Sequence, residues 1–383
     1  MSRIPLLLAL LAGGVCLPRP ADGDEAVTLL RIPNEGIQPQ VVVDKEQRVH
    51  LVYFRGDPAA GDLFYVRQAA DSWKFSEPLP INSQPGSAIA VGSIRGGQIA
   101  LGTADRIHVA WNGSSQAQPR GPGKYDSPML YARLNDERSA FEQERDVIGQ
   151  AHTLDGGGSV AADREGNVHV VWHAGTDEAE RRVWVVRSRD EGRTFSEETP
   201  VDVPRLGACG CCGLKAFADA GGAVYVLYRS AHDKVHRDMQ LLTSRDQGMT
   251  FRQQPLDQWM VATCPMSSES FAEGAQGVFA AWETNGQVSF ARIDKKSGKA
   301  GRVTPAPGKG TGRKHPVIAV SDKGHLLLAW TEGTGWQKGG ALAWQEFDAA
   351  GKPTRVRGRQ AGIPVWSFAA VAARPDGGFA IVY

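Results

Sequence analysis

The stretch SVAADREGNVHVVWH, residues 159–173, places two short apolar segments on either side of a turn that contains Asp, Gly and Asn. Alternating apolar and β-branched residues predict strands, and the Gly and Asn between them predict a tight reversal of the chain. The stretch therefore predicts one β-hairpin whose second strand ends in an aromatic residue, Trp172.

The same hairpin recurs along the chain. Its other copies are VVVDKEQRVHLVYF (41–54), IALGTADRIHVAWN (99–112), KAFADAGGAVYVLYR (215–229), SFAEGAQGVFAAWE (270–283), VIAVSDKGHLLLAWT (317–331) and FAAVAARPDGGFAIVY (368–383). Most copies are followed by a third and a fourth strand, such as RRVWVVRS (181–188) and FSEETPV (195–201). Four-stranded units that repeat every ~45–55 residues are typical of propeller blades.

We therefore predict an all-β protein in which residues 24–383 form a single β-propeller domain of four-stranded blades. The last copy has only two strands, and AVTLLRIP (26–33) would supply its outer strand and close the ring. This pattern favours seven blades, and six is the alternative if one copy forms no blade. Closure of the ring removes exposed sheet edges, which otherwise promote aggregation.

The N-terminus has the pattern of a secretory signal peptide over residues 1–23. Arg3 precedes an apolar run, and small and Pro-rich residues follow, ending in Ala21-Asp22-Gly23. A lipoprotein acylated at Cys16 is the alternative. We therefore expect an exported protein, periplasmic or secreted, in a compartment that permits disulfides.

Charge and composition limit the partners. The chain is 42% hydrophobic and 22% charged, as in globular proteins, and without residues 1–23 its acidic and basic residues are equal in number. This balance gives no electrostatic reason for binding to nucleic acid or to anionic membranes. No later segment is apolar enough to span a bilayer. We expect a monomer without nucleic-acid partners and without a membrane span.

Two turns between third and fourth strands carry a sharper motif. SRDEGRTF (188–195) and SRDQGMTF (244–251) both fit the pattern Ser-x-Asp-x-Gly-x-Thr-aromatic. On these motifs the chain resembles the BNR/Asp-box propellers, the superfamily that includes sialidases. The resemblance implies that the boxes lie on the face opposite the binding funnel. We expect Asp190 and Asp246 to bind turn amides, which is a structural role.

The resemblance also implies a sialidase site with three arginines for a carboxylate, a Tyr–Glu nucleophile pair and an Asp acid. Arg31-Ile32-Pro33 matches the family's Arg-Ile-Pro motif, but the inner strand of the blade is expected to start near Gln40. Five tyrosines lie inside predicted strands and are therefore not placed as nucleophiles: Tyr53, Tyr65, Tyr131, Tyr225 and Tyr228. The fold carries over, whereas a complete sialidase catalytic set does not.

In a propeller of this type, the loops before each first strand and after each second strand share one face and converge on the axis in a funnel. That position collects reactive residues: Phe54, Arg55, Asn112, His173, Arg229, Glu283, Thr331 and Glu332 after second strands, and Gln38, Gln40, 152–158, 209–212, 264–268 and 313–315 before first strands. Several His, Arg, Glu and Cys residues at one mouth indicate a site. In LDGGGS (154–159), three glycines permit either close approach of a ligand or tight packing at the axis.

The leading hypothesis is a sialidase-like propeller that binds a glycan or a similar polar ligand in this funnel, with or without hydrolysis. The expected ligand contacts are His152, His173, Arg229, Arg237 and Arg313. If the protein is a glycoside hydrolase of the exo-sialidase type, we expect Glu283 and Asp238 to be its acid and base, because glycoside cleavage generally uses two carboxyl groups. The alternative is a non-catalytic propeller for recognition or assembly. Three further histidines inside second strands, His50, His108 and His169, are expected to be packing or hydrogen-bonded sheet residues rather than ligands.

Four cysteines follow residue 23, and they lie before the first strands of two adjacent blades. Cys209, Cys211 and Cys212 belong to GACGCCGLKA (207–216), and Cys264 belongs to TCPMSS (263–268). An even number in an exported protein favours disulfides, with one bridge from Cys264 into the cluster and a second bond that includes Cys209.

The alternatives for this cluster are free structural thiols and a thiolate metal or redox site. His152, His173 or His236 would then be further ligands, and sulfur with imidazole suits Cu(I) or Zn(II). We expect disulfides here, and no metal or other cofactor.

Overall fold

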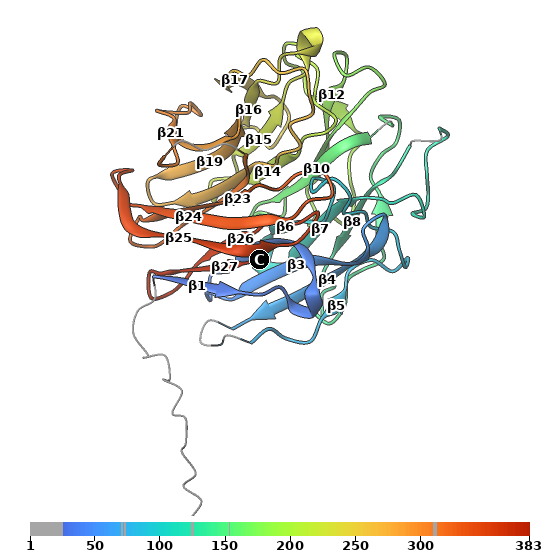
Figure 1. The fold of residues 1–383 in the computed structure, drawn as a ribbon. Helices are drawn as coiled ribbons and strands as arrows, with labels where there is room; N and C mark the ends of the chain where they lie inside the picture. Colours follow the sequence, from blue (N-terminus) through green and yellow to red (C-terminus); the bar gives the residue numbers. More distant parts are fainter. Residues whose placement is uncertain (1–25, 70–71, 73, 124–125, 153, 309–311) are drawn as a thin grey trace, which may run out of the picture.

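The computed structural model describes residues 26–383, apart from 70–71, 73, 124–125, 153 and 309–311. These residues form seven sheets around a central axis and three short 3-10 turns, with no α-helix in the described part (Figure 1). The prediction of an all-β propeller with seven blades is confirmed. The predicted signal peptide, residues 1–23 with Cys16, lies outside the described residues. Within them, no helix has the length and hydropathy needed to cross a bilayer.

Blades one to six each have four antiparallel strands in chain order from the axis outward. Blade one consists of β2 (Ile37–Val43), β3 (Val49–Asp57), β4 (Ala60–Gln68) and β5 (Leu79–Pro80). Blade two consists of β6 (Gln98–Leu101), β7 (Ile107–Asn112), β8 (Met129–Arg133) and β9 (Arg145–Asp146). Blade three consists of β10 (Leu154–Ala162), β11 (Val168–Ala174), β12 (Arg182–Ser188) and β13 (Thr199–Pro200). Blade four consists of β14 (Leu214–Ala218), β15 (Val224–Arg229), β16 (Met239–Ser244) and β17 (Arg252–Asp257). Blade five consists of β18 (Ser270–Gly274), β19 (Gly277–Thr284), β20 (Gln287–Ile293) and β21 (Thr304–Pro305). Blade six consists of β22 (Arg313–Val320), β23 (Leu326–Glu332), β24 (Gly340–Phe347) and β25 (Pro353–Ile363). The 3-10 turns are η1 (Pro33–Glu35), η2 (Thr103–Asp105) and η3 (His232–Lys234).

Blade seven combines the two ends of the chain. Its inner strands are β26 (Ala370–Ala373) and β27 (Phe379–Val382), and its third strand is β1 (Val27–Leu30), which pairs in parallel with β27 (Figure 1). Two more backbone bonds flank the pairing: Phe379 N donates to Ala26 O at 2.9 Å, and Tyr383 N donates to Leu30 O at 3.0 Å. The predicted closure of the ring by the N-terminal strand is confirmed.

The core lies between neighbouring blades, and the second strands carry its largest side chains. The aromatic residues that end these strands in blades two, three and five are fully buried: Trp111, Trp172 and Trp282. Alternation along each strand sends such rings into the gap between two sheets, where they remove a large apolar area from water. Period-2 patterning therefore explains both the strands and the packing between blades.

The two Asp-containing turns have the expected structural role. Asp190 Oδ1 accepts the amide of Thr194 at 2.9 Å, and Oδ2 accepts the Thr194 hydroxyl at 2.6 Å. Asp246 makes the same bonds to Thr250, at 2.9 and 2.5 Å. Burial raises the pKa of Asp190, but the bonds from Ser188 and Thr194 outweigh burial and lower it to about 2. Both turns connect third to fourth strands, at the end of the ring away from the loops that enter the inner strands.

The histidines inside the second strands are hydrogen-bonded sheet residues, as predicted. Their bonds join His50 Nδ1 to Tyr65 Oη (2.7 Å), His50 Nε2 to Asp44 Oδ2 (3.0 Å), His108 Nδ1 to Tyr131 Oη (2.7 Å) and His169 Nε2 to Gln247 O (3.0 Å). Burial lowers the pKa of His108 to about 3, so this ring is neutral at physiological pH.

A chain that starts at residue 31 tests the closure of the ring. Compared with a chain that starts at residue 24, it lacks β1, so it loses the pairing with β27 and the packing of the half-buried Val27 and Leu29. We expect the free energy of unfolding to fall by about 2–4 kcal/mol in thermal or urea denaturation. A peptide of residues 24–31 added in trans should restore part of the loss by adding a strand, and a scrambled peptide should not. Equal stability of the two chains would contradict the closure.

Candidate functional site

The loops that enter the inner strands meet at one end of the axis in a layer that we call the funnel floor, made of Gln38, Ser93, Gly156–Gly158, Gly210–Gly213, Ser267–Glu269, His315 and Ser367. Hydrogen bonds join these loops between neighbouring blades. They run from Asn112 Nδ2 to Gly156 O (2.5 Å), Gly157 N to Cys212 O (3.4 Å), Gly213 N to Ser267 O (2.8 Å), His315 N to Ser267 Oγ (3.4 Å) and Gln38 N to Ser367 Oγ (3.1 Å). The floor is therefore a connected layer across the axis.

Strained backbone conformations occur in the loops around the axis. Five non-glycine residues of the loops around the axis have left-handed φ angles: Gln38 (55°), Ser93 (62°), Met266 (49°), His315 (50°) and Trp366 (62°). For a side chain as bulky as Trp, such a φ is unfavourable, at a cost on the order of 1–3 kcal/mol. Strain of this kind persists only where the surroundings impose it, and it is found preferentially at functional sites.

The three glycines of LDGGGS provide tight packing at the axis. A Cβ on Gly156 would lie 2.1 Å from Cε1 of His173, and a Cβ on Gly157 would lie 2.6 Å from the carbonyl oxygen of Ile94. Of the two interpretations of this motif, the structure therefore supports packing between blades.

Arg229 and Glu283 end adjacent second strands, and the structure brings them together. The guanidinium of Arg229 donates to the main-chain oxygen of Glu283, and its Nη2 lies 4.0 Å from Glu283 Oε2. Both residues are 1% exposed, and Arg229 Nε and Glu283 Oε2 have no hydrogen-bond partner. Burial raises the pKa of Glu283, against the opposing charge of Arg229.

Glu269 adds a second buried carboxyl group. It directly precedes β18, it is 5% exposed, and neither of its carboxyl oxygens has a hydrogen-bond partner. Burial raises its pKa well above the usual value, and Arg229 opposes the shift. Two carboxyls with raised pKa beside one buried guanidinium form a group of the kind found at functional sites.

Two further predicted site residues, Arg237 and Asp238, face different partners. Arg237 Nη2 lies 2.8 Å from Glu178 Oε2. Asp238 Oδ1 accepts the amide of Trp259 at 2.9 Å, and Asp238 Oδ2 lies 3.8 Å from a ring nitrogen of each of two stacked histidines, His232 and His236.

The remaining predicted contacts are spread over several blades. Arg313 Nη1 donates to Gln287 Oε1 at 2.9 Å, and its guanidinium lies over the ring of Trp330. His173 is 1% exposed with both ring nitrogens unpartnered, and burial lowers its pKa to about 3. His152 is half-buried in a separate loop beside Gly121. These three side chains do not form one cluster with Glu283.

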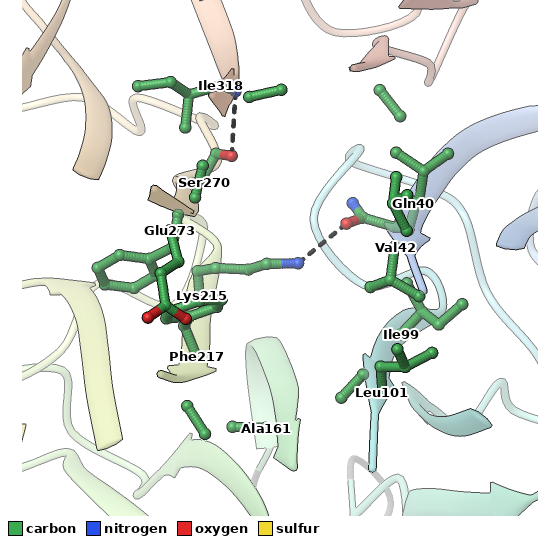
Figure 2. A pocket seen from close by; sticks show the side chains of 18 of the residues that line it. Gln40, Val42, Ile99, Leu101, Ala161, Lys215, Phe217, Ser270, Glu273 and Ile318 are labelled. Atoms are coloured by element: carbon green, nitrogen blue, oxygen red, sulfur yellow. Dashed lines mark hydrogen bonds between the residues drawn. The ribbon is translucent and has the colours of Figure 1, made fainter. Parts of the chain in front are cut away.

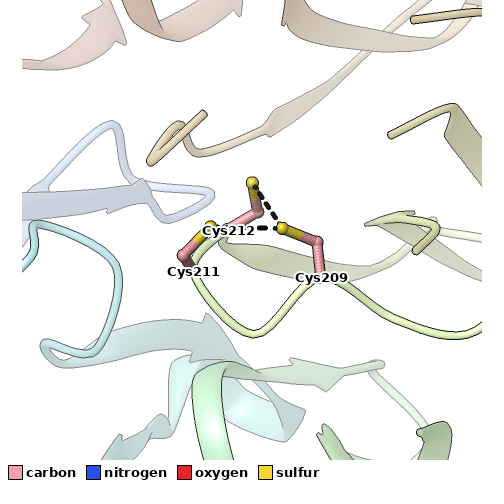
Figure 3. A group of neighbouring side chains, drawn as sticks. All are labelled: Cys209, Cys211 and Cys212. Carbon is pink, nitrogen blue, oxygen red and sulfur yellow. Dashed lines mark hydrogen bonds between the residues drawn. The ribbon is translucent and has the colours of Figure 1, made fainter. Parts of the chain in front are cut away.

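The cysteine loop lies between β13 and β14 and presents three sulfurs to one another (Figure 3). Cys209 Sγ lies 3.3 Å from Cys211 Sγ and 3.4 Å from Cys212 Sγ. Hydrogen bonds from these two thiols lower the pKa of Cys209, whereas burial raises that of Cys212 to about 12. All four cysteines of the described residues are free thiols, and Cys264 is exposed. The predicted bridge from Cys264 is thus not present here, and the pairing stays a prediction.

The two ends of the axis differ in the size of their cavities. At the funnel floor the cavities are about 20 Å³ and about 10 Å³, which holds a water or an ion rather than a sugar ring. Below the floor, a channel of about 350 Å³ runs between the inner strands of all seven blades toward the turns at the other end (Figure 2).

Lys215 reaches across this channel from blade four, as Figure 2 shows for its contact with Gln40. Its ammonium donates to Gln40 Oε1 at 2.9 Å and to Gln98 Oε1 at 2.8 Å, on blades one and two. Burial lowers the pKa of Lys215 to about 8, and Glu269 opposes the shift. The walls around it are mostly apolar, with Val42, Ile99 and Phe217 among them.

Sequence reasoning missed Glu269, Lys215 and the pair Trp336 and Trp366. The loop predicted to face the funnel, 264–268, ends one residue before Glu269. The available signal was a charged residue at the start of an otherwise apolar inner strand. The rings of Trp336 and Trp366 meet edge to face, with centroids 4.5 Å apart, although 30 residues separate them. Nothing in the local pattern joined these two indoles.

No family model and no curated protein matches this sequence. Solved structures do match it at low identity. A Trypanosoma rangeli sialidase in complex with the inhibitor DANA has a TM-score of 0.53 and 9% identity, over 79% of this chain and 53% of that one. A Hadza microbial sialidase has a TM-score of 0.51 and 14% identity, over 84% and 71%. A Penicillium chrysogenum α-L-arabinanase complexed with arabinobiose has a TM-score of 0.50 and 12% identity, over 84% and 95%.

At these identities the likeness concerns the fold, which is a sialidase-like propeller. The chain spans about half the length of the trypanosomal sialidase that it matches.

The variant Glu269→Gln tests the buried carboxyl. A folded-state pKa above the unfolded value of about 4.5 means that the carboxyl destabilises the fold increasingly as pH rises above 4.5. We expect the melting temperature of the variant to exceed that of the wild type by about 2–4 °C at pH 8 and to equal it near pH 4. The exposed Glu165→Gln is the control, with less than about 1 °C of change at either pH. A difference that does not depend on pH would contradict the raised pKa.

Proposed function

We propose that this propeller binds a glycan, or a similar polar ligand, on its funnel face. The observation that carries the proposal is the pair of indoles on that face. Trp336, in the loop between β23 and β24, is 57% exposed, and it contacts Trp366 in the loop before β26. An exposed indole packs well on the C–H face of a pyranose, while its N–H and nearby polar groups bind hydroxyls.

Polar and basic side chains surround these indoles. Ser93, Lys314 and Lys338 line the same shallow depression, and Trp366 occupies it with a left-handed backbone. Ammonium groups beside an aromatic platform suit hydroxyl-rich or acidic sugars, since they donate hydrogen bonds and carry positive charge. The depression is small in volume, so the ligand would lie on the surface rather than in a deep pocket.

We favour binding over a hydrolytic reaction in which Glu283 and Asp238 would act as acid and base. These carboxyls are 1% and 7% exposed. A sugar would reach them only if the residues that cover them moved. Hydrolysis by this pair is therefore the second proposal, and a non-catalytic recognition propeller is the alternative.

The motifs at 188–195 and 244–251 support assignment to the Asp-box propellers. We further propose that residues 1–23 direct export, to the periplasm or out of the cell, and that the protein is a monomer. The balanced charge of the remaining chain supports a polar or sugar ligand over nucleic acid.

Replacing the indoles tests the binding surface. We expect Trp336→Ala and Trp366→Ala each to weaken binding of the best ligand from a glycan array by about tenfold or more, measured by calorimetric titration. Met249→Ala is the matched control, because Met249 is 56% exposed on the opposite face. Absence of any glycan ligand, or unchanged affinity in both Trp variants, would contradict the proposal.

Turnover of aryl glycosides tests the second proposal. If the wild type hydrolyses one of them, Glu283→Gln and Asp238→Asn should each lower kcat by at least about 100-fold, because each would remove a proton-transfer group. The exposed Glu165→Gln should leave kcat unchanged. Unchanged turnover in both buried variants would refute their roles, and no turnover by the wild type would favour the recognition propeller.

A further inference from the structure

The cysteine loop of blade four lies outside the proposed glycan surface and forms its own side-chain cluster (Figure 3). The three sulfurs of Cys209, Cys211 and Cys212 all lie within 4.8 Å of one another. We propose that these three thiols bind one soft metal ion, Cu(I), as thiolate ligands. On binding, the ion replaces the thiol protons, which leave to solvent.

The backbone holds this loop in the required shape without help from a metal. Cys209 N donates to Arg229 O at 2.9 Å, and Cys212 N donates back to Cys209 O at 3.3 Å. Cys212 O accepts Gly157 N from blade three, and Gly213 N donates to Ser267 O of blade five. Because three blades fix the loop, its sulfurs converge at little further cost in conformational entropy.

The geometry of the sulfurs suits three-coordinate binding. Three sulfurs in a plane at about 2.3 Å from one ion lie about 4.0 Å apart. The observed 3.3 and 3.4 Å separations need only a small expansion to reach that distance. No fourth His, Asp or Glu donor joins this group within 4.8 Å in the described part of the chain. Zn(II) sites usually complete a tetrahedron with a fourth ligand, whereas soft thiolates favour Cu(I).

Positive charge beside the thiols compensates for the thiolates. The charges of Arg229 and Arg237 both act on Cys209, and neither guanidinium Nε has a hydrogen-bond partner. Glu178 ties one of them to the loop, because it accepts both Arg237 Nη2 at 2.8 Å and the amide of Gly210 at 3.3 Å. Three thiolates with one Cu(I) carry a net charge of about −2. The two guanidiniums offset part of it, because Arg237 is also paired with Glu178 and Arg229 lies 4.0 Å from Glu283.

The burial of each cysteine determines how an ion can reach the cluster. Cys209 and Cys212 are buried, whereas Cys211 is half-exposed, so an ion can enter along its side. Cys264 is exposed and does not belong to the cluster. It therefore provides a matched control, because its loss removes a cysteine but no proposed ligand.

The experiment titrates the reduced full-length protein with Cu(I) without oxygen, in competition with bathocuproine disulfonate, and in parallel with Zn(II). We expect one Cu(I) per chain, bound more tightly than Zn(II), and X-ray absorption that reports sulfur neighbours at about 2.3 Å. Cys211→Ser and Cys209→Ser should weaken Cu(I) binding by at least about 100-fold. Cys264→Ser should leave the stoichiometry and the affinity unchanged.

Cys211→Ser alters a half-exposed side chain, so its circular dichroism and melting temperature should match those of the wild type and rule out misfolding. Unchanged Cu(I) affinity in both cluster variants, absence of Cu(I) binding, or tighter binding of Zn(II) than of Cu(I) would overturn the proposal. Protein purified without reductant tests the competing hypothesis, a disulfide bond within the cluster. A loss of two thiols and of two mass units, with no Cu(I) bound after reduction, would assign a disulfide to the cluster instead. None of these readouts depends on glycan binding.

Discussion

The parallel pairing of β1 with β27 is the interaction on which the rest of the structure depends. It joins Val27–Leu30 to Phe379–Val382, the two ends of the described chain. Without it, blade seven would have two strands and an unpaired edge. With it, blades seven and one become neighbours, and Gln38 bonds to Ser367 and to the carbonyl oxygen of Trp366. The funnel floor forms only because the ring closes.

The floor divides the axis into two chemically different spaces. The floor itself holds the buried carboxyl of Glu269 and part of the thiol loop, and the exposed indoles lie on its outer side. Below it lies a largely apolar channel crossed by Lys215. Unpartnered buried groups such as those of Arg229 and Glu269 cost stability, and so do the left-handed residues around the axis. Costs of this kind are expected where a site is held in position by the fold.

Several features followed from local patterns alone. Hairpins with Gly, Asp or Asn turns predicted the blades, and the incomplete last copy predicted that residues 26–33 would complete it, as β1 does. The bond of Asp190 to the turn amide of Thr194 and the structural role of His108 also followed from sequence position. In each case the interaction lies within one hairpin or turn, or the only vacant strand position in the ring determines the partner.

The sequence by itself determined the strand repeat, the closure of the ring and the end of the axis at which reactive residues gather. Only the tertiary structure decided which of them are accessible, because burial depends on how seven loops pack across the axis. It buried Glu283 and Arg229, paired Trp336 with Trp366, and directed three thiols toward one another while leaving Cys264 in solvent. These contacts join residues of different loops and blades, or depend on the backbone turn of one loop, and no period of the sequence encodes them.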